Sequence, residues 1–568
     1  MKQPAKDDIS IVLAGQAGQG IETIESVLVR ILKHACYNVF ATKEYMSRVR
    51  LGANSTEIRM SSKNKVNCYI DRIDLLVPLE KQSIARLKSR ITASTIVLCD
   101  AEVFTGFGHH IDFQFTAMAE DVGGKIFTST IAIGAVCGIL GISIDLVASK
   151  VKKEFSDKKE EIVQKNMVAL QKGYDAGAEL ATAGTVKFDV VTNACVAEDI
   201  LINGAEAIAL GAIAGGCNFI SSYPMSPSTA VLSSLAEKSK IFDIIAEQAE
   251  DEIAAINMAL GAWYAGARGM VTTSGGGFAL MCEGVSLAGM IESPIVIHIG
   301  QRPGPATGLP TRTEQGDLNL ALYAGHGVFP RIILAPGTIE DGFYLAQKAF
   351  NLAAKYQVPV FILSDQYYID SYYNVLPFNL DGITIESGVV KTAKGYKRYA
   401  LTSSGISPRG IPKNGDGLVL IDSDEHDEEG HITEDFSVRT AMVDKRLRKL
   451  ANFKDDMVQP RFSGNTNYKF LVVSWGSTCN AIEEALAIIG DPAIAHLHFL
   501  QVYPIPPVTK RYLDKAKKTI LVEGNATGQF GQLIKQELCV DIDRKVLKYS
   551  GEPFHVEELV AKIKKEAS

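Results

Sequence analysis

The sequence predicts an α/β protein built from three α/β domains. Segments typical of strands alternate with segments typical of helices along most of the chain, and this order of elements builds parallel sheets. The chain has 568 residues, enough for roughly three or four compact units. It has 49 glycines and 20 prolines, which suits many turns between strands and helices better than disorder.

The first domain is expected to end near Leu180. It opens with the strand-like run Ile9–Ala14, turns at Gly15–Gly20 and continues as a helix through Leu32. Further strands are expected at 74–77 and 95–99, and further helices at 81–89, 130–140 and 158–176. The small residues of 181–186 are the candidate linker.

The alternation of strands and helices starts again after Ile200, which predicts a doubly wound parallel sheet. Strands are expected at 219–221, 269–273, 294–299 and 359–363, helices at 204–215, 229–238 and 251–265, and a glycine turn at 275–277 followed by a helix to Met290. Residues 382–465 are polar and irregular, with one short strand at 418–421. A last α/β unit contains strands at 470–474 and 519–523, with residues 476–478 leading into a helix.

Charge and hydropathy argue against two classes of partner. The net charge of −7 gives no electrostatic reason to bind nucleic acid. The longest apolar stretch, 131–147, is interrupted by three glycines, so it predicts a buried helix and no membrane span. Because the start carries Lys6, Asp7 and Asp8 and lacks an apolar leader, we expect a cytoplasmic protein.

The nine cysteines occur singly, and no pair has CxxC spacing. This pattern indicates reduced thiols and neither a disulfide framework nor a metal site. If the activity of this protein requires iron–sulfur clusters, another polypeptide must carry them.

Residues 222–229 follow an expected strand and precede an expected helix. Ser226 is a good helix N-cap, Pro227 fits the first helical turn, and the free N–H groups there could hold an anion or a substrate oxygen. An ordinary capped helix explains the same residues.

Three acids, Glu250, Asp251 and Glu252, stand at the start of the helix expected at 251–265. Acids in a first helical turn usually complement the helix dipole. Alternatively, one of them faces an apolar pocket, where burial lets it share a proton with a heterocycle nitrogen. The spacing alone does not choose among the three.

Residues 302–317 follow the strand expected at 294–299, at a place where ligand sites form in doubly wound sheets. Three prolines stiffen this loop, which is either a carboxylate clamp or a rigid surface loop with solvated charges. The polar side chains that a clamp could use are Arg302, Thr307, Thr311, Arg312, Glu314 and Gln315.

Three further patterns carry little weight. The spacing of Gly15, Gly18 and Gly20 is not that of the dinucleotide-binding fingerprint, so a close-packed turn is expected there. His426 and His431 lie among carboxylates in the polar connector, where a solvated loop is expected rather than a metal site. A metal motif of the thiamine diphosphate type is not complete after Gly415, because the next asparagine, Asn452, is too distant.

Taken together, four segments resemble the α subunit of 2-oxoacid:ferredoxin oxidoreductases, in the family's order and spacing. They are Tyr223–Ser228, Glu250–Ala255, Thr273–Phe278 and Gly304–Leu318. Two segments before them, Gly15–Gly20 and Arg48–Gly52, resemble the family's γ subunit, and Val522–Gln529 resembles its transketolase C-terminal-like domain. The fusion of γ and α parts, with the connector 404–435, is most similar to the 2-oxoglutarate branch.

The resemblance implies a division of the chain. Residues 1–183 would be a γ-type catalytic domain and 196–380 a doubly wound domain that binds the pyrimidine of thiamine diphosphate. Residues 381–465 would be the connector and 466–568 the transketolase C-terminal-like domain.

The resemblance also implies roles for single residues. Glu252, in register with the family's glutamate upstream of Gly261 and Gly266, would contact the pyrimidine N1′. The catalytic residues would be Glu252, Ser226 and Arg312, with Arg312 gripping the C1 carboxylate of the substrate. The cofactor would be bound by Tyr223, Pro224, Met225, Glu252, Ser274 and Gly275, and the substrate by Ser226, Thr307 and Arg312. Ser226 stands where many members have threonine.

The implied reaction is the oxidative decarboxylation of a 2-oxoacid, with acyl transfer to coenzyme A and electron transfer to ferredoxin. The preferred substrate would be 2-oxoglutarate, with pyruvate, branched-chain or broad-range 2-oxoacids as alternatives. A β subunit would share the thiamine diphosphate and carry Mg²⁺ and the iron–sulfur cluster. A nicotinamide-dependent dehydrogenase and a non-catalytic partner-binding subunit are the alternatives of other classes.

Overall fold

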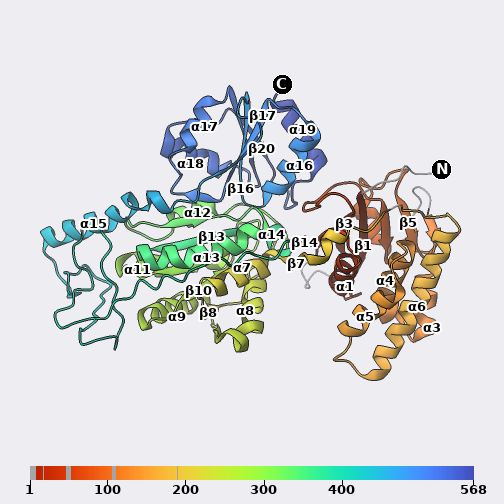
Figure 1. Cartoon of the computed structure of the whole chain (residues 1–568), viewed down its shortest axis with the longest axis horizontal. Helices are drawn as coiled ribbons and strands as arrows, with labels where there is room; N and C mark the ends of the chain where they lie inside the picture. The colour runs from red at the N-terminus through yellow and green to blue at the C-terminus, as the bar shows by residue number, and fades with distance from the viewer. Residues whose placement is uncertain (1–7, 17, 46–52, 105–109, 189) are drawn as a thin grey trace. The chain divides into compact units, whose positions relative to one another are not determined.

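The computed structural model describes residues 8–16, 18–45, 53–104, 110–188 and 190–568. Its strands form three sheets (Figure 1). The chain divides into two compact units. The first contains the residues up to Ile202 together with Asp370–Pro377 and His555–Glu557, and the second contains the remainder.

The first unit is built on an eight-stranded mixed sheet in the order β6-β5-β4-β1-β3-β2-β14-β7. The strands are β1 (Asp8–Gln16), β2 (Asn38–Glu44), β3 (Ala53–Ser61), β4 (Leu75–Pro78), β5 (Ile96–Cys99), β6 (His110–Asp112), β7 (Ile200–Asn203) and β14 (Tyr372–Val375). The helices are α1 (Ile21–His34), α2 (Lys81–Leu87), α3 (Phe115–Val122), α4 (Thr128–Ile139), α5 (Ile144–Glu154) and α6 (Glu160–Thr182), with short 3₁₀ helices at Lys125–Phe127 and Ala194–Glu198.

Side chains of β1 alternate between two apolar cores. Ile9, Ile11 and Leu13 belong to the larger core, which includes residues of α1, α4 and α6, while Val12 and Ala14 belong to a smaller one on the other face. The strand therefore has helical cover on both sides, which accounts for its nearly continuous apolar sequence.

Glycines let α4 and α6 approach closely. A Cβ on Gly134 would lie 2.4 Å from the carbonyl oxygen of Leu170, and one on Gly173 would lie 2.2 Å from that of Ile131. The apolar stretch expected to be a buried helix is such a helix, since every residue of α4 after Thr128 is buried. Within the described ranges no single helix is long and apolar enough to cross a membrane; α3 and the adjoining helix 125–139 pass such a test only as a pair, bent by 116°.

The strands and helices predicted for this unit are present, with ends shifted by a few residues, but five strands and two helices were not predicted: β2, β3, β6, β7, β14, α3 and α5. Several polar residues of β2 and β3 are buried, and Glu57 on β3 accepts hydrogen bonds from Arg90 at 2.8 and 2.9 Å. The linker prediction is wrong for Ala181 and Thr182, which end α6. The family-like segment Arg48–Gly52 lies outside the described residues.

The second unit contains a seven-stranded sheet in the order β18-β12-β13-β11-β10-β8-β9. Its strands are β8 (Phe219–Ser222), β9 (Ile245–Gln248), β10 (Gly269–Thr273), β11 (Ile295–Gln301), β12 (Ile332–Leu334), β13 (Pro359–Asp365) and β18 (Gln501–Tyr503). Its helices are α7 (Gly204–Ala214), α8 (Thr229–Phe242), α9 (Glu252–Ala265), α10 (Gly275–Leu280), α11 (Cys282–Met290), α12 (Leu318–Tyr323), α13 (Ile339–Tyr356) and α14 (Gln366–Asp370).

All neighbouring strands from β12 to β9 in this sheet are parallel, and only β18 is antiparallel. The predicted doubly wound fold is confirmed. The chain runs from β8 toward the β9 edge and then from β10 toward the opposite side, so the direction of winding reverses between β8 and β10. In open α/β sheets the carboxyl ends of strands at such a reversal form the usual ligand crevice.

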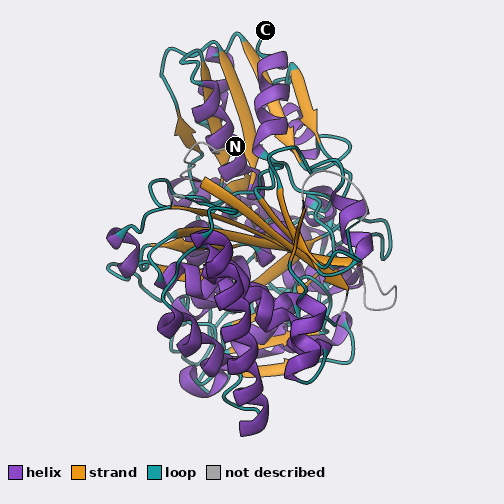
Figure 2. Ribbon diagram, turned by 90° about the vertical axis from the view of Figure 1, so that its right-hand side faces the viewer, coloured by secondary structure: helices purple, strands orange, loops and turns teal. Residues whose placement is uncertain are grey.

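A third sheet, of five strands in the order β15-β17-β16-β19-β20, forms a C-terminal domain with helices on both sides (Figures 1 and 2). Its strands are β15 (Arg461–Ser463), β16 (Phe470–Trp475), β17 (Ile494–Phe499), β19 (Lys518–Glu523) and β20 (Arg544–Leu547). Its helices are α16 (Cys479–Ile489), α17 (Thr509–Lys515), α18 (Gln529–Leu538) and α19 (Val556–Glu566), with a 3₁₀ turn at Gly476–Thr478.

The connector between these two domains is irregular, as predicted, except for α15 (Phe436–Ala451) and the 3₁₀ turn Phe453–Asp456. The strand expected at 418–421 is wrong, because those residues form no strand. Along α15 the buried positions are Met442, Lys445, Arg446 and Lys449. They have helical spacing, but three of the four are charged, so the sequence did not reveal an apolar stripe.

Candidate functional site

The candidate residues follow four neighbouring parallel strands at their carboxyl ends. Residues 223–228 follow β8, Glu252 comes shortly after β9, Ser274 follows β10, and the loop 302–317 follows β11. Since the direction of winding reverses between β8 and β10, these segments lie where a doubly wound sheet places a ligand.

Ser226 does not cap a helix. The helix α8 begins at Thr229, and its N-cap position is Ser228. The Ser228 hydroxyl donates to the Met225 carbonyl at 2.7 Å and makes no capping hydrogen bond to α8. The prediction of an N-cap at Ser226 is therefore wrong. Ser226 is exposed, and Tyr223 is 40% exposed, whereas Pro224 and Met225 are half-buried.

The carbonyl oxygen of Ser226 ties this segment to two others. It accepts a hydrogen bond from the Ser274 hydroxyl at 2.8 Å and another from Arg302 at 2.6 Å. Ser274 is fully buried at the end of β10. The structure thus brings Ser226, Ser274 and Arg302 together, although Arg302 was not among the assigned site residues.

The three acids at the start of α9 have different surroundings. Glu250 is exposed, and Asp251 is the N-cap of α9, where its carboxylate accepts the N–H of Ala254 at 2.8 Å. Glu252 is 3% exposed, and its Oε1 has no hydrogen-bond partner among the described residues. Glu252 is therefore the acid that is buried and left with an unused oxygen.

Residues 275–277 begin the helix α10, so the glycine turn expected there is wrong. The glycines leave room for two carboxyl groups: Glu252 lies against Gly277, and Asp317 lies against Gly275. Asp317 Oδ2 is also buried without a hydrogen-bond partner in the described part of the chain. Burial, and secondarily the charge of Glu314, raise the pKa of Asp317 to about 6, although Arg302 opposes the shift.

The loop 302–317 has an exposed tip and an anchored end. Residues 304–309, including Thr307, are exposed, and the carbonyl of Ala306 would lie 3.7 Å from a Cβ on Gly276. Arg312 is half-buried and packs along Gly551 of the C-terminal domain. No hydrogen bond or ion pair joins Arg312 or Thr307 to Glu252 in the described part of the chain.

Gln315 was expected as part of a possible clamp, but it is 1% exposed and bound to the C-terminal domain. Its side-chain amide donates to the Trp475 carbonyl at 2.8 Å and accepts the N–H of Gly524 at 2.7 Å. No local sequence pattern distinguishes an inward from an outward glutamine in a loop.

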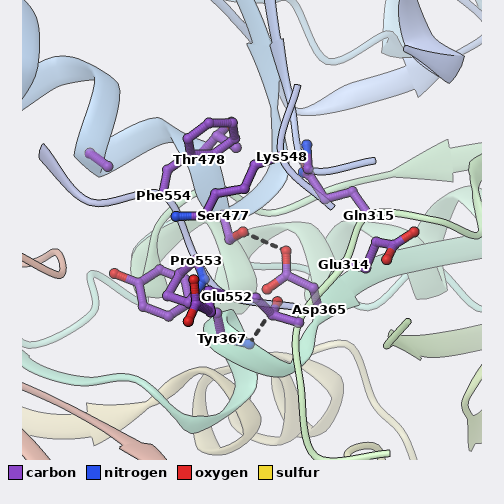
Figure 3. A pocket seen from close by; sticks show the side chains of 13 residues that line it. Glu314, Gln315, Asp365, Tyr367, Ser477, Thr478, Lys548, Glu552, Pro553 and Phe554 are labelled. Carbon is purple, nitrogen blue, oxygen red and sulfur yellow. Dashed lines mark hydrogen bonds between the residues drawn. The ribbon is translucent and has the colours of Figure 1, made fainter. Parts of the chain in front are cut away.

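A pocket lies at this anchored end, and its lining includes Thr313–Gln315, Ser477 and Lys548 (Figure 3). Asp365, at the end of β13, accepts a hydrogen bond from Ser477 there, and burial raises its pKa. Glu252, Ser226 and Ser274 do not line this pocket.

The weak motifs remain outside the site. Gly18 and Gly20 have φ angles of +94° and +74° and form the turn before α1. His426 is fully buried and packs against Tyr399 with 3.8 Å between ring centroids and 33° between the ring planes, so the expectation of a solvated loop is wrong for this residue. His431 is exposed and could share a cation with Asp427 and Glu429, but Asp427 already accepts backbone N–H groups of its own loop.

The nine cysteines are all free thiols. Five of them, Cys68, Cys99, Cys137, Cys217 and Cys479, are buried, and Cys195 and Cys539 are exposed. Burial raises the pKa of Cys137 and Cys217, which disfavours the thiolates that iron would need.

Two family models match the chain. Residues 210–445 match "Pyruvate flavodoxin/ferredoxin oxidoreductase, thiamine diP-bdg", and residues 10–176 match "Pyruvate ferredoxin/flavodoxin oxidoreductase".

Curated proteins and a solved structure extend this likeness to nearly the whole chain. A 2-oxoacid:ferredoxin oxidoreductase subunit alpha from Sulfolobus sp. is 30% identical over 97% of this chain and 96% of its own length. The 2-oxoglutarate synthase subunit KorA of Archaeoglobus fulgidus is 34% identical over 63% of this chain and 97% of its own. The structure of 2-oxoglutarate:ferredoxin oxidoreductase from Magnetococcus marinus, with 2-oxoglutarate, coenzyme A and succinyl-CoA bound, is 29% identical and superposes with a TM-score of 0.90 over 99% of this chain and 100% of its own.

Proposed function

The chain belongs to the 2-oxoacid:ferredoxin oxidoreductases as an α subunit with a fused γ-type domain, and we propose that it forms the pyrimidine-binding half of a thiamine diphosphate site completed by a β subunit. The proposed reaction converts 2-oxoglutarate, coenzyme A and oxidised ferredoxin into succinyl-CoA, CO₂ and reduced ferredoxin. The solved relative with 2-oxoglutarate and succinyl-CoA bound, and the relative named 2-oxoglutarate synthase, support this choice of substrate.

The observation that carries the proposal is the buried Oε1 of Glu252, which has no partner within the described ranges. Burying a carboxyl oxygen without a hydrogen bond is costly, so a ligand nitrogen is a natural partner for it. In this proposal Glu252 holds and exchanges a proton at the pyrimidine nitrogen of the cofactor. Thiamine diphosphate, when bound, supplies carbanion stabilisation during the loss of CO₂.

The remaining assignments follow the elements around Glu252. Tyr223, Pro224 and Met225 after β8, with Ser274 and Gly275 after β10, would hold the cofactor. The substrate would be faced by Ser226 and by Thr307 on the loop tip. The Ser226 carbonyl accepts hydrogen bonds from Ser274 and Arg302.

Arg312 would bind the C1 carboxylate, because a guanidinium binds a carboxylate in a bidentate fork. The β subunit would carry Mg²⁺ and the iron–sulfur cluster that passes electrons to ferredoxin. The single free cysteines of this chain support that division of labour, and the cytoplasm is the proposed location. We expect the chain purified alone to hold no stoichiometric iron and to have negligible oxidoreductase activity, and metal analysis that finds such iron would contradict this.

The test is Glu252→Gln in the complex with the β subunit. Glutamine retains the size of the side chain but cannot exchange the proton, so turnover should fall by more than about a hundredfold. The control is Glu250→Gln, two residues earlier and exposed, which should leave turnover unchanged. A near-normal rate for Glu252→Gln would refute the assignment and favour a non-catalytic role for this subunit. Assays of the wild-type complex with 2-oxoglutarate, pyruvate and branched-chain 2-oxoacids would test the substrate.

A further inference from the structure

We propose that the C-terminal domain positions the loop 302–317, here called the substrate loop, and that Gln315 is the residue through which the domain holds it. The proposal rests on the assignment of Arg312 to the substrate carboxylate, three residues earlier on the same loop. It gives a task to a domain that contributes none of the residues assigned above to cofactor or substrate.

Gln315 makes hydrogen bonds with both its side chain and its backbone. Besides the two side-chain bonds to Trp475 and Gly524, its N–H donates to the Gly524 carbonyl at 2.6 Å. Its own carbonyl accepts from the Asn525 side chain at 3.0 Å. The residue is thus held at four points by the carboxyl ends of β16 and β19.

The side-chain amide of Gln315 occupies a socket between Gly476 and Gly524, and the socket fits an amide of this length. A Cβ on Gly476 would lie 2.6 Å from Gln315 Nε2, and one on Gly524 would lie 3.1 Å from Oε1. Because Nε2 must donate to the Trp475 carbonyl, a glutamate there would set oxygen against oxygen. The chemistry of the socket therefore selects glutamine over its charged counterpart.

The socket lies at the point where the direction of winding of the C-terminal sheet reverses. In the C-terminal sheet the chain winds from β16 toward β17 on one side, and from β19 toward β20 on the other. The crevice between β16 and β19 is thus the place where an α/β sheet of this kind binds a ligand. Here that crevice is filled by Gln315, so the domain binds the loop as other domains bind small molecules.

A second support lies directly beneath Arg312. The N–H of Thr313 donates to the Gly551 carbonyl at 3.2 Å, and a Cβ on Gly551 would lie 3.2 Å from Arg312 Cβ. Gln529 adds a third tie, since its amide donates to the Gly316 carbonyl at 2.8 Å. Arg312 is therefore packed at its Cβ against Gly551, and the loop residues that follow it are held by hydrogen bonds. This limits the conformational entropy that Arg312 loses on binding a carboxylate.

The experiment uses the α–β complex carrying Gln315→Met, which keeps the length of the side chain but removes both amide hydrogen bonds, and Gln315→Glu. We expect the KM for the 2-oxoacid to rise by about tenfold or more, while the KM for ferredoxin and the Kd for thiamine diphosphate, measured by calorimetry, change by less than about twofold. If Gln315 served only the stability of the fold, its variants would lower the free energy of unfolding, and the KM for the 2-oxoacid would not change more than the other two constants.

The matched control is Tyr323→Phe, which removes a 2.7 Å hydrogen bond to Gln536 between the same two domains but away from the loop. It should leave the KM for the 2-oxoacid unchanged. A normal KM in Gln315→Met, or a rise equal to that in Tyr323→Phe, would overturn the proposal.

If both Gln315 variants fail to fold, Gly551→Ala tests the second support, and a normal KM there would also overturn the proposal. Arg312→Lys separates the two hypotheses. If it leaves the KM unchanged, the assignment of Arg312 is wrong; if it raises the KM and Gln315→Met does not, only the positioning role is wrong.

Discussion

The Oε1 atom of Glu252 occupies the space that a side chain on Gly277 would need, since a Cβ built there would lie 2.3 Å from it. The same Cβ would lie 2.3 Å from the hydroxyl oxygen of Thr273. A residue on α10 thus controls where the buried carboxyl at the start of α9 can stand.

Gly277→Ala is expected to displace Glu252 and to weaken thiamine diphosphate binding while the fold survives, because overpacking of this kind costs about 1–3 kcal/mol. The measurements are the Kd for the cofactor in the α–β complex and its thermal midpoint. Gly261→Ala on α9 is the matched control, since a Cβ there meets nothing within 4 Å. It should be neutral, or should stabilise by about 0.5–1 kcal/mol through helix propensity. An unchanged Kd in Gly277→Ala would argue against a role for Glu252 at the cofactor.

Arg312→Lys is expected to raise the KM for every 2-oxoacid, because an ammonium lacks the fork that matches a carboxylate. Removing the charge altogether in Arg312→Met should cost about 2–5 kcal/mol of substrate binding. Arg302→Lys is the comparison, since Arg302 donates to the Ser226 carbonyl and serves the loop itself. If the loss in Arg312→Lys appears only with 2-oxoglutarate and not with pyruvate, Arg312 reads the distal carboxylate and its C1 role is refuted.

Asp317→Asn is expected to change stability in a pH-dependent way. The folded pKa of Asp317, about 6, lies above the value of 3.8 for a free aspartate, so the fold favours its protonated form. Well below pH 3.8 Asp317 is protonated in both the folded and the unfolded state, and the shift contributes nothing. As the pH rises from 4 to above 6, the wild type loses about 1–3 kcal/mol relative to the variant. Denaturant titrations of both proteins at pH 4.5 and 7.5 measure the difference, and equal gaps at the two pH values would contradict it.

Glu292→Gln is expected to destabilise the protein strongly. The Glu292 carboxylate lies 2.5 Å from the Lys445 ammonium and 2.6 Å from that of Lys449, and all three side chains are buried. Burial alone would raise the pKa of Glu292, but Lys449, Lys445 and Arg398 hold it well below its usual range. Burial lowers the pKa of Lys449 to about 8 despite Glu292.

Removing the anion that Lys445 and Lys449 share leaves buried cations uncompensated, which should cost about 3–5 kcal/mol. Limited proteolysis should then cut the connector 381–465 more readily, because α15 is attached through these lysines. The control is Asp541→Asn, which removes an exposed pair with Lys535 and should cost less than about 1 kcal/mol. Similar unfolding free energies for the two variants would show that the cluster does not hold the connector.

The sequence by itself determined the fold class and most of the parallel core. Strands such as β10, β11 and β13 are buried along their whole length, so a short apolar run between turn residues was enough to predict each of them. The order and spacing of the site motifs likewise carried the family. These features are local, because side-chain periodicity and turn chemistry depend on neighbours within a few residues.

The tertiary structure alone decided which polar side chains point inward. Nothing in the spacing separated Glu252 from Glu250 and Asp251, and nothing distinguished Gln315 from a solvated loop residue, since Gln315 acquires its partners Trp475 and Gly524 from positions at least 160 residues away. The helix α15 was missed for the same reason: its buried face carries Lys445, whose carboxylate partner Glu292 lies 153 residues earlier in the chain. A charged or amide side chain can be buried only where its partner stands, and that partner is brought close by the packing of the whole unit.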